Sequence, residues 1–192
     1  MRAPFQSYLG LETQPHTMGY DFSEMNTDDF IALCREIGAE PFITINPCWN
    51  TPDENAAWVE YCNGDVSTPY GKLRANRGHQ EPYNVQFWSL GNEFGYGHME
   101  GDNTPAGYCQ IALENGKKML EASPGLSLCS SGPYPNKEWA EFSAKPLAGI
   151  SQMISQHYYG YDPHYTDLST VEEEYNRCMA SVSRMRELIH QS

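Results

Sequence analysis

Apolar residues along the chain follow two patterns, which are short continuous runs and longer stretches with helical spacing. The continuous runs are residues 41–46, 85–90, 126–131 and 150–158, each bounded by Gly, Pro or Asn. Runs of this length are typical of buried strands. Helical segments are expected at 27–37, 52–62, 105–122 and 137–144, and after Thr170. A helix followed by four strand–helix units predicts an α/β fold with a parallel sheet and right-handed crossovers.

The expected helix starts carry recognisable capping residues. Thr51 and Thr104 are each followed by Pro at the first helical position, and Asn26 or Thr27 can cap the first helix. In that first helix one apolar face is expected, and its spacing is i, i+3, i+4 and i+7. Its residues are Phe30, Leu33, Cys34 and Ile37.

Two segments lack a clear period. Residues 1–25 are interpreted as an irregular N-terminal segment, with loop over residues 1–22, and residues 26–192 as one domain. Residues 64–83 are also expected to be irregular. Their cations Lys72, Arg74 and Arg77 are interpreted as a solvated loop, since three positive charges are few in a chain of net charge −13.

Composition narrows the function classes. The chain has 192 residues and is 40% hydrophobic, which suits one domain with a core. A net charge of −13 and a pI of about 4.7 argue against nucleic acid or an anionic membrane as partner. The six cysteines form no CxxC pair, so no metal is expected and free thiols are favoured. The first residues lack an apolar signal sequence, which leaves the compartment undetermined with a cytoplasmic location favoured.

Candidate chemistry gathers where the expected strands end. Glu93 and Asn92 follow the second strand, and Glu93 can act as an acid or a base while Asn92 can hydrogen-bond a hydroxyl. Trp49 follows the first strand, and His157, Tyr158 and Tyr159 stand at the end of the fourth. Each alone is more often a packing or solvated residue. Together at one end of a parallel sheet, aromatic, amide and carboxyl groups suit recognition of a sugar.

The sequence around these residues resembles that of family 51 α-L-arabinofuranosidases, which are glycoside hydrolases of clan A. The resemblance rests on blocks in the family's order: FIALCREIGAEP at 30–41, AWVEYCN at 57–63, EPYNV at 81–85 and FWSLGNE at 87–93. It covers about residues 28–132, and beyond Gly132 it is limited to residues 157–159.

The resemblance implies a partial (β/α)8 TIM barrel, about strands three to six with their helices. It implies a retaining glycosidase of arabinose and carbohydrate metabolism that acts on arabinofuranosyl-containing saccharides without a cofactor, while homo-oligomer assembly of the full-length enzyme is left open. Glu93 would be the general acid/base and Asn92 a binder of the 2-hydroxyl. His157, Tyr158, Tyr159 and Trp49 would line the sugar site.

A retaining mechanism needs a second carboxylate about 5–5.5 Å away. In the family this nucleophile is a Glu that ends strand seven, and the chain has no counterpart at a strand end, so the chain alone is expected to be inactive. Three other carboxylates could approach Glu93 as the second carboxylate, although none has a spacing that argues for this role: Glu100, Asp102 and Asp162. Two alternatives stay open: another clan A hydrolase of endoglucanase or xylanase type, and an inactive carbohydrate-binding barrel relic.

Overall fold

The computed structural model describes residues 14–16, 19–21, 25–95, 104–132, 136–158 and 170–191. Its elements in chain order are β1 (Gln14–His16), β2 (Gly19–Asp21), α1 (Thr27–Glu36), β3 (Phe42–Thr44), α2 (Pro52–Asn63), α3 (Pro69–Asn76), β4 (Phe87–Ser89), α4 (Pro105–Ala122), β5 (Ser127–Ser131), α5 (Lys137–Leu147), β6 (Met153–Ser155) and α6 (Val171–Gln191).

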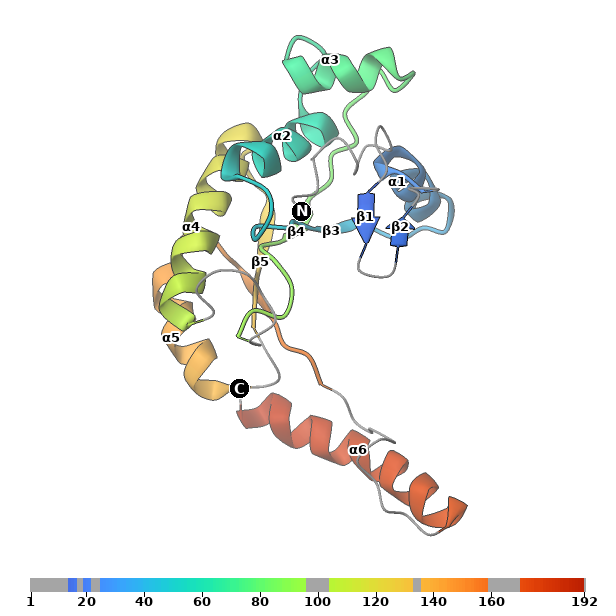
Figure 1. Ribbon diagram of the computed structural model, residues 1–192, viewed down its shortest axis with the longest axis vertical. Helices are drawn as coiled ribbons and strands as arrows, with labels where there is room; N and C mark the ends of the chain where they lie inside the picture. The colour runs from blue at the N-terminus through green and yellow to red at the C-terminus, as the bar shows by residue number, and fades with distance from the viewer. Residues whose placement is uncertain are drawn as a thin grey trace.

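A four-stranded parallel sheet organises the molecule. Its order is β3-β4-β5-β6, so each strand pairs with the next one in the chain. Figure 1 shows α2, α4 and α5 following one another along the outside of the strands, with α6 set apart from them. The expected parallel α/β sheet of four strand–helix units is confirmed, although the strands are shorter than their apolar runs.

The core lies between the sheet and the layer formed by α2 and α4. Trp88 in β4 is fully buried and meets Trp58 of α2 edge to face, with ring centroids 5.7 Å apart. Val59, Tyr108 and Leu128 bring α2, α4 and β5 into the same cluster. This burial holds the carboxyl ends of β4 and β5 at fixed positions.

The buried face of α1 differs from the expectation. Leu33 and Ile37 are 41% and 68% exposed, whereas Ile31 and Cys34 are buried beside Thr27 and Asp28. The polar groups explain the rotation of the helix, because they are hydrogen-bonded to residues packed against it. The carboxylate of Asp28 accepts bonds from the hydroxyls of Tyr61 and Tyr83 and from the Arg77 guanidinium. The indole N–H of Trp58 donates to the Thr27 hydroxyl.

Two segments expected to be irregular contain regular structure. β1 and β2 pair antiparallel within residues 1–22, so the loop prediction is wrong at these six residues. Helix α3 occupies the middle of residues 64–83, where Thr68 caps it and Pro69 is its first residue. Arg74 of α3 is fully buried, and Arg77 pairs with Asp28, so the solvated-loop interpretation is wrong for both.

Three sequence features have simple outcomes in the structure. All six cysteines are free thiols, and Cys178 is the exposed one. In the part of the chain that the structure describes, no cluster of His, Cys, Asp and Glu is suited to hold a metal ion. Among the same residues, no helix is long and apolar enough to span a bilayer.

Candidate active site

The turn after β4 is held rigidly by its flanking residues. Gly91 has φ +115°, and a Cβ there would lie 2.5 Å from Cε2 of Phe94, so only glycine fits. Phe94 is fully buried and packs on Tyr108 with ring centroids 4.8 Å apart. The hydroxyl of Ser89 donates to the carbonyl of Gly91 at 2.8 Å. Glu93 is therefore presented by a turn anchored on both sides.

Glu93 itself has a left-handed backbone, with φ +54°. This conformation costs a non-glycine residue about 1–2 kcal/mol, because its Cβ crowds the following carbonyl oxygen. Such conformations persist where the surroundings enforce them, and they cluster at functional sites. The side chain is 21% exposed, which leaves a carboxylate partly shielded but accessible.

His157 meets Glu93 from the end of β6. Nδ1 of His157 lies 2.9 Å from Oε1 of Glu93, although the two residues are 64 positions apart in the chain. On its other side, Nε2 of His157 lies 3.3 Å from the hydroxyl of Ser155, the last residue of β6. The imidazole is 28% exposed. A serine, a histidine and a carboxylate therefore form one hydrogen-bonded row above the sheet.

Tyr108 of α4 ties together the strand ends beneath this row. Its hydroxyl donates to the carbonyl of Leu90 and accepts from the amide of Ser131, so it links the ends of β4 and β5. Burial raises the pKa of Tyr108 above its ordinary value, so the hydroxyl stays protonated well into alkaline pH. Trp139 of α5 adds an indole N–H bond to the carbonyl of Ser131.

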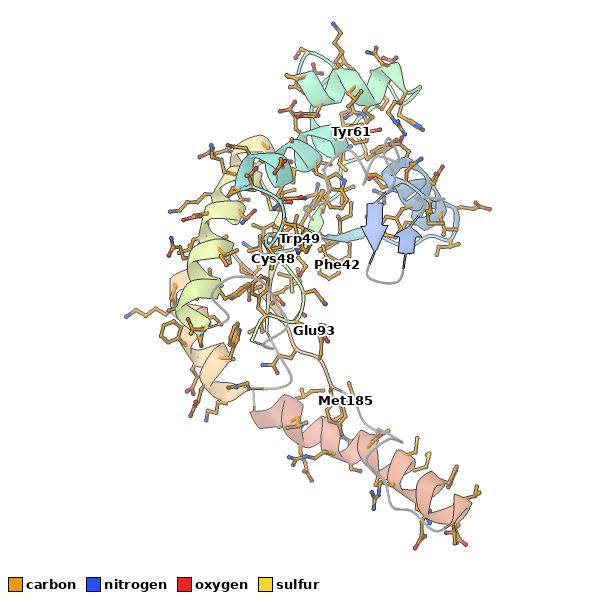
Figure 2. All side chains as sticks on the ribbon, viewed as in Figure 1. Phe42, Cys48, Trp49, Tyr61, Glu93 and Met185 are labelled. Carbon is orange, nitrogen blue, oxygen red and sulfur yellow. The ribbon has the colours of Figure 1, made fainter. Side chains whose placement is uncertain are left out.

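The other candidate residues occupy different surroundings. Asn92 is exposed next to Glu93, and Trp49 is half-buried in the loop after β3. The hydroxyl of Tyr158 donates to the carbonyl of Ser181 in α6. Tyr159 lies outside the described residues, as do Glu100, Asp102 and Asp162. In the view of Figure 2, Glu93 lies between the Cys48–Trp49 segment and Met185 of α6. The sugar-binding roles of the candidate residues stay predictions: Asn92, Trp49, His157, Tyr158 and Tyr159.

Ser155 was not among the candidates from sequence. The signal was present, since Ser155 and His157 are two positions apart at a strand end and so project to the same side. A lone serine in a strand carries little information until its partner is known.

A parallel α/β sheet with a carboxylate at the end of one strand and a histidine at the end of another is typical of the α/β enzymes whose site lies at the carboxyl ends of the strands. Within that class, residues 7–177 match the family model described as the alpha-L-arabinofuranosidase 1 domain. The chain belongs to the α-L-arabinofuranosidases of glycoside hydrolase family 51.

Individual relatives agree with this assignment. Alpha-L-arabinofuranosidase C of Emericella nidulans is 34% identical over 128 residues, which are 67% of this chain and 25% of that protein. The intracellular exo-α-(1→5)-L-arabinofuranosidase of Halalkalibacterium halodurans is 30% identical over 144 residues, 72% of this chain and 29% of that protein. The crystal structure of the Thermotoga maritima α-L-arabinofuranosidase in complex with arabinose matches 98% of this chain and 40% of its own, with a TM-score of 0.76 and 33% identity.

The chain therefore spans about a quarter to two-fifths of the length of these relatives. A structure from Xanthomonas axonopodis is only 18% identical and still superposes with a TM-score of 0.85, which shows that the fold persists as the sequence diverges.

Proposed function

We propose that the full-length protein releases α-L-arabinofuranosyl residues from arabinose-containing saccharides, with Glu93 as the general acid/base, and that residues 1–192 alone are inactive. The observation that carries this proposal is the 2.9 Å contact between Glu93 and His157 at the carboxyl ends of two parallel strands. Family membership supports the substrate class. The four parallel strands would correspond to strands three to six of a (β/α)8 barrel.

The proposed mechanism is retaining. Glu93 protonates the departing glycosidic oxygen in the first step and deprotonates water in the second. A glutamate from another strand of the complete barrel, outside residues 1–192, would supply the nucleophile. Asn92, exposed beside Glu93, would hydrogen-bond the sugar 2-hydroxyl, while His157, Tyr158, Tyr159 and Trp49 would line the sugar site.

Substitution of Glu93 by alanine in the full-length protein tests the acid/base role. Loss of general acid catalysis should lower kcat/KM on arabino-oligosaccharides by about 10²–10⁴-fold. An aryl arabinofuranoside with a strongly acidic phenol needs little protonation, so its first step should slow much less. Glu81→Ala is the matched control, because Glu81 is an exposed carboxylate before β4, and it should leave both rates unchanged.

Equal losses on both substrates would contradict the acid/base role and assign Glu93 to another task. Turnover of glucan or xylan oligosaccharides in place of arabinofuranosides would move the protein to another clan A activity. Sugar binding without any turnover by the wild-type protein would support the binding relic.

A further inference from the structure

We propose that Ser155 is a positioning residue that sets the orientation of His157, and through it the oxygen of Glu93 that carries the catalytic proton. The inference rests on the proposed acid/base role of Glu93. It concerns the row in which the Ser155 hydroxyl, the imidazole of His157 and Oε1 of Glu93 follow one another at 3.3 and 2.9 Å.

The backbone of Ser155 is fixed by the sheet. It pairs in register with Ser131 of β5, and its carbonyl accepts the amide of Gly132 at 3.2 Å. His157, by contrast, lies two residues beyond the last residue of β6, where sheet pairing no longer restrains its ring. The hydroxyl of Ser155 therefore extends the rigidity of the sheet to the imidazole.

The protons along the row follow from the chemistry of each group. A neutral imidazole has one N–H and one acceptor nitrogen. When Nδ1 of His157 donates to Oε1 of Glu93, Nε2 becomes the acceptor and is satisfied by the O–H of Ser155. An N–H directed at Oε1 makes that oxygen the less favourable position for the acid proton. A general acid must hold its proton on the oxygen that meets the leaving group, so the orientation of His157 decides between the two oxygens of Glu93 and favours Oε2.

The opposite tautomer would be unproductive. With hydrogen on Nε2, the lone pair of Nδ1 would face Glu93, and the acid proton would be drawn to Oε1 and bound by the imidazole. The Ser155 hydroxyl can also accept a bond, so it stays paired if His157 becomes doubly protonated. Without that hydroxyl, the ring loses the partner that orients its Nδ1 edge toward Glu93.

The experiment is a double-mutant cycle in the full-length protein. Ser155→Ala should lower kcat on arabino-oligosaccharides about 3- to 10-fold, the size expected for one lost neutral hydrogen bond, with little change in KM. The kcat/KM for an aryl arabinofuranoside with a strongly acidic phenol should change less, because this ratio reports the first step, in which such a leaving group needs little protonation. Ser155→Thr keeps the hydroxyl and should restore activity. Ser127→Ala, a half-buried serine at the far end of β5, is the matched control.

The second arm replaces His157 by asparagine, whose side-chain N–H can stand in for Nδ1 but which has no Nε2. In that background Ser155→Ala should have no further effect, because the hydroxyl no longer has a ring nitrogen to orient. Nitrogen NMR of His157 should show hydrogen on Nδ1 in the wild type and loss of that single state in Ser155→Ala.

Additive effects of the two substitutions, or a Ser155→Ala loss that Ser155→Thr does not restore, would overturn the inference. So would equal slowing on both substrate types. The proposed function fails separately: if Glu93→Ala retains full activity, the acid/base assignment is lost. If Glu93 behaves as the acid and Ser155→Ala behaves as the wild type, only the role of Ser155 is refuted.

Discussion

The guanidinium of Arg74 is expected to be a main source of stability for the segment between α2 and β4. It is fully buried and donates four hydrogen bonds, all to backbone carbonyls. Nη1 reaches Tyr61 and Gly64 at the end of α2, both at 2.8 Å, while Nε and Nη2 reach His79 at 3.1 Å and Gln80 at 3.2 Å. One side chain therefore joins the end of α2, helix α3 and the loop that follows it.

The expected loss in the free energy of unfolding depends on which of these hydrogen bonds water can replace. A hydrogen bond to a charged group contributes about 1.5–3 kcal/mol, so four would sum to about 6–12 kcal/mol. The carbonyls of His79 and Gln80 lie in half-buried bonds and can be hydrated once the side chain is gone. The two buried bonds remain, offset in part by the desolvation of the cation. We therefore expect Arg74→Met to lower the free energy of unfolding by about 3–5 kcal/mol.

Urea denaturation, followed by tryptophan fluorescence, measures this loss as a shift of midpoint at unchanged slope. Hydrogen exchange of the amides in residues 64–80 should show the damage concentrated there. Lys72→Met is the matched control, since Lys72 is exposed on the same helix and should change little. A loss under about 1 kcal/mol for Arg74→Met, close to that of Lys72→Met, would refute the reasoning.

Two further predictions concern the site and the α1 network. Asn92→Ala should lower kcat/KM by removing a hydrogen bond that strengthens in the transition state, with the melting temperature unchanged because Asn92 is exposed; a matching loss of thermal stability would point to packing instead. Burial, then the hydrogen bond to Asp28, raises the pKa of Tyr61, so its contribution is present below about pH 10 and is lost as pH rises above that value. Tyr61→Phe should therefore start about 1 kcal/mol less stable at neutral pH yet lose less stability than the wild type between about pH 9 and 11, as urea midpoints would show; parallel losses in both proteins would contradict this.

Local sequence signals were sufficient for most of the fold. Thr51 and Thr104, each followed by proline, mark the starts of α2 and α4 where the structure has them. The same Thr–Pro signal stands at Thr68 before α3. Residues 64–83 nevertheless lack a clear apolar period and were expected to be irregular. The segment is stabilised in large part by the bonds from Arg74 to backbone carbonyls, and no hydrophobic pattern reveals such bonds.

The rotation of α1 has a similar cause. Its apolar spacing predicted a face with Leu33 and Ile37, yet the helix turns Thr27 and Asp28 inward. Buried polar residues are tolerated only when paired, and their partners Tyr61, Tyr83 and Arg77 come from distant segments. A periodicity count treats such residues as exterior, so the face that it selects is shifted from the buried one: Cys34 is buried as expected, whereas Leu33 and Ile37 are exposed.

At the candidate site too, single residues could be predicted from the sequence, whereas the contact between them could not. Glu93 and His157 could be selected singly because each follows an apolar strand-length run. Their contact could not, because in a flat sheet β4 and β6 would stand about 10 Å apart with β5 between them. The side chains of Glu93 and His157 nevertheless meet; β5, which lies between their strands, ends at Ser131 and is followed by Gly132, where a Cβ would lie 3.1 Å from Trp139.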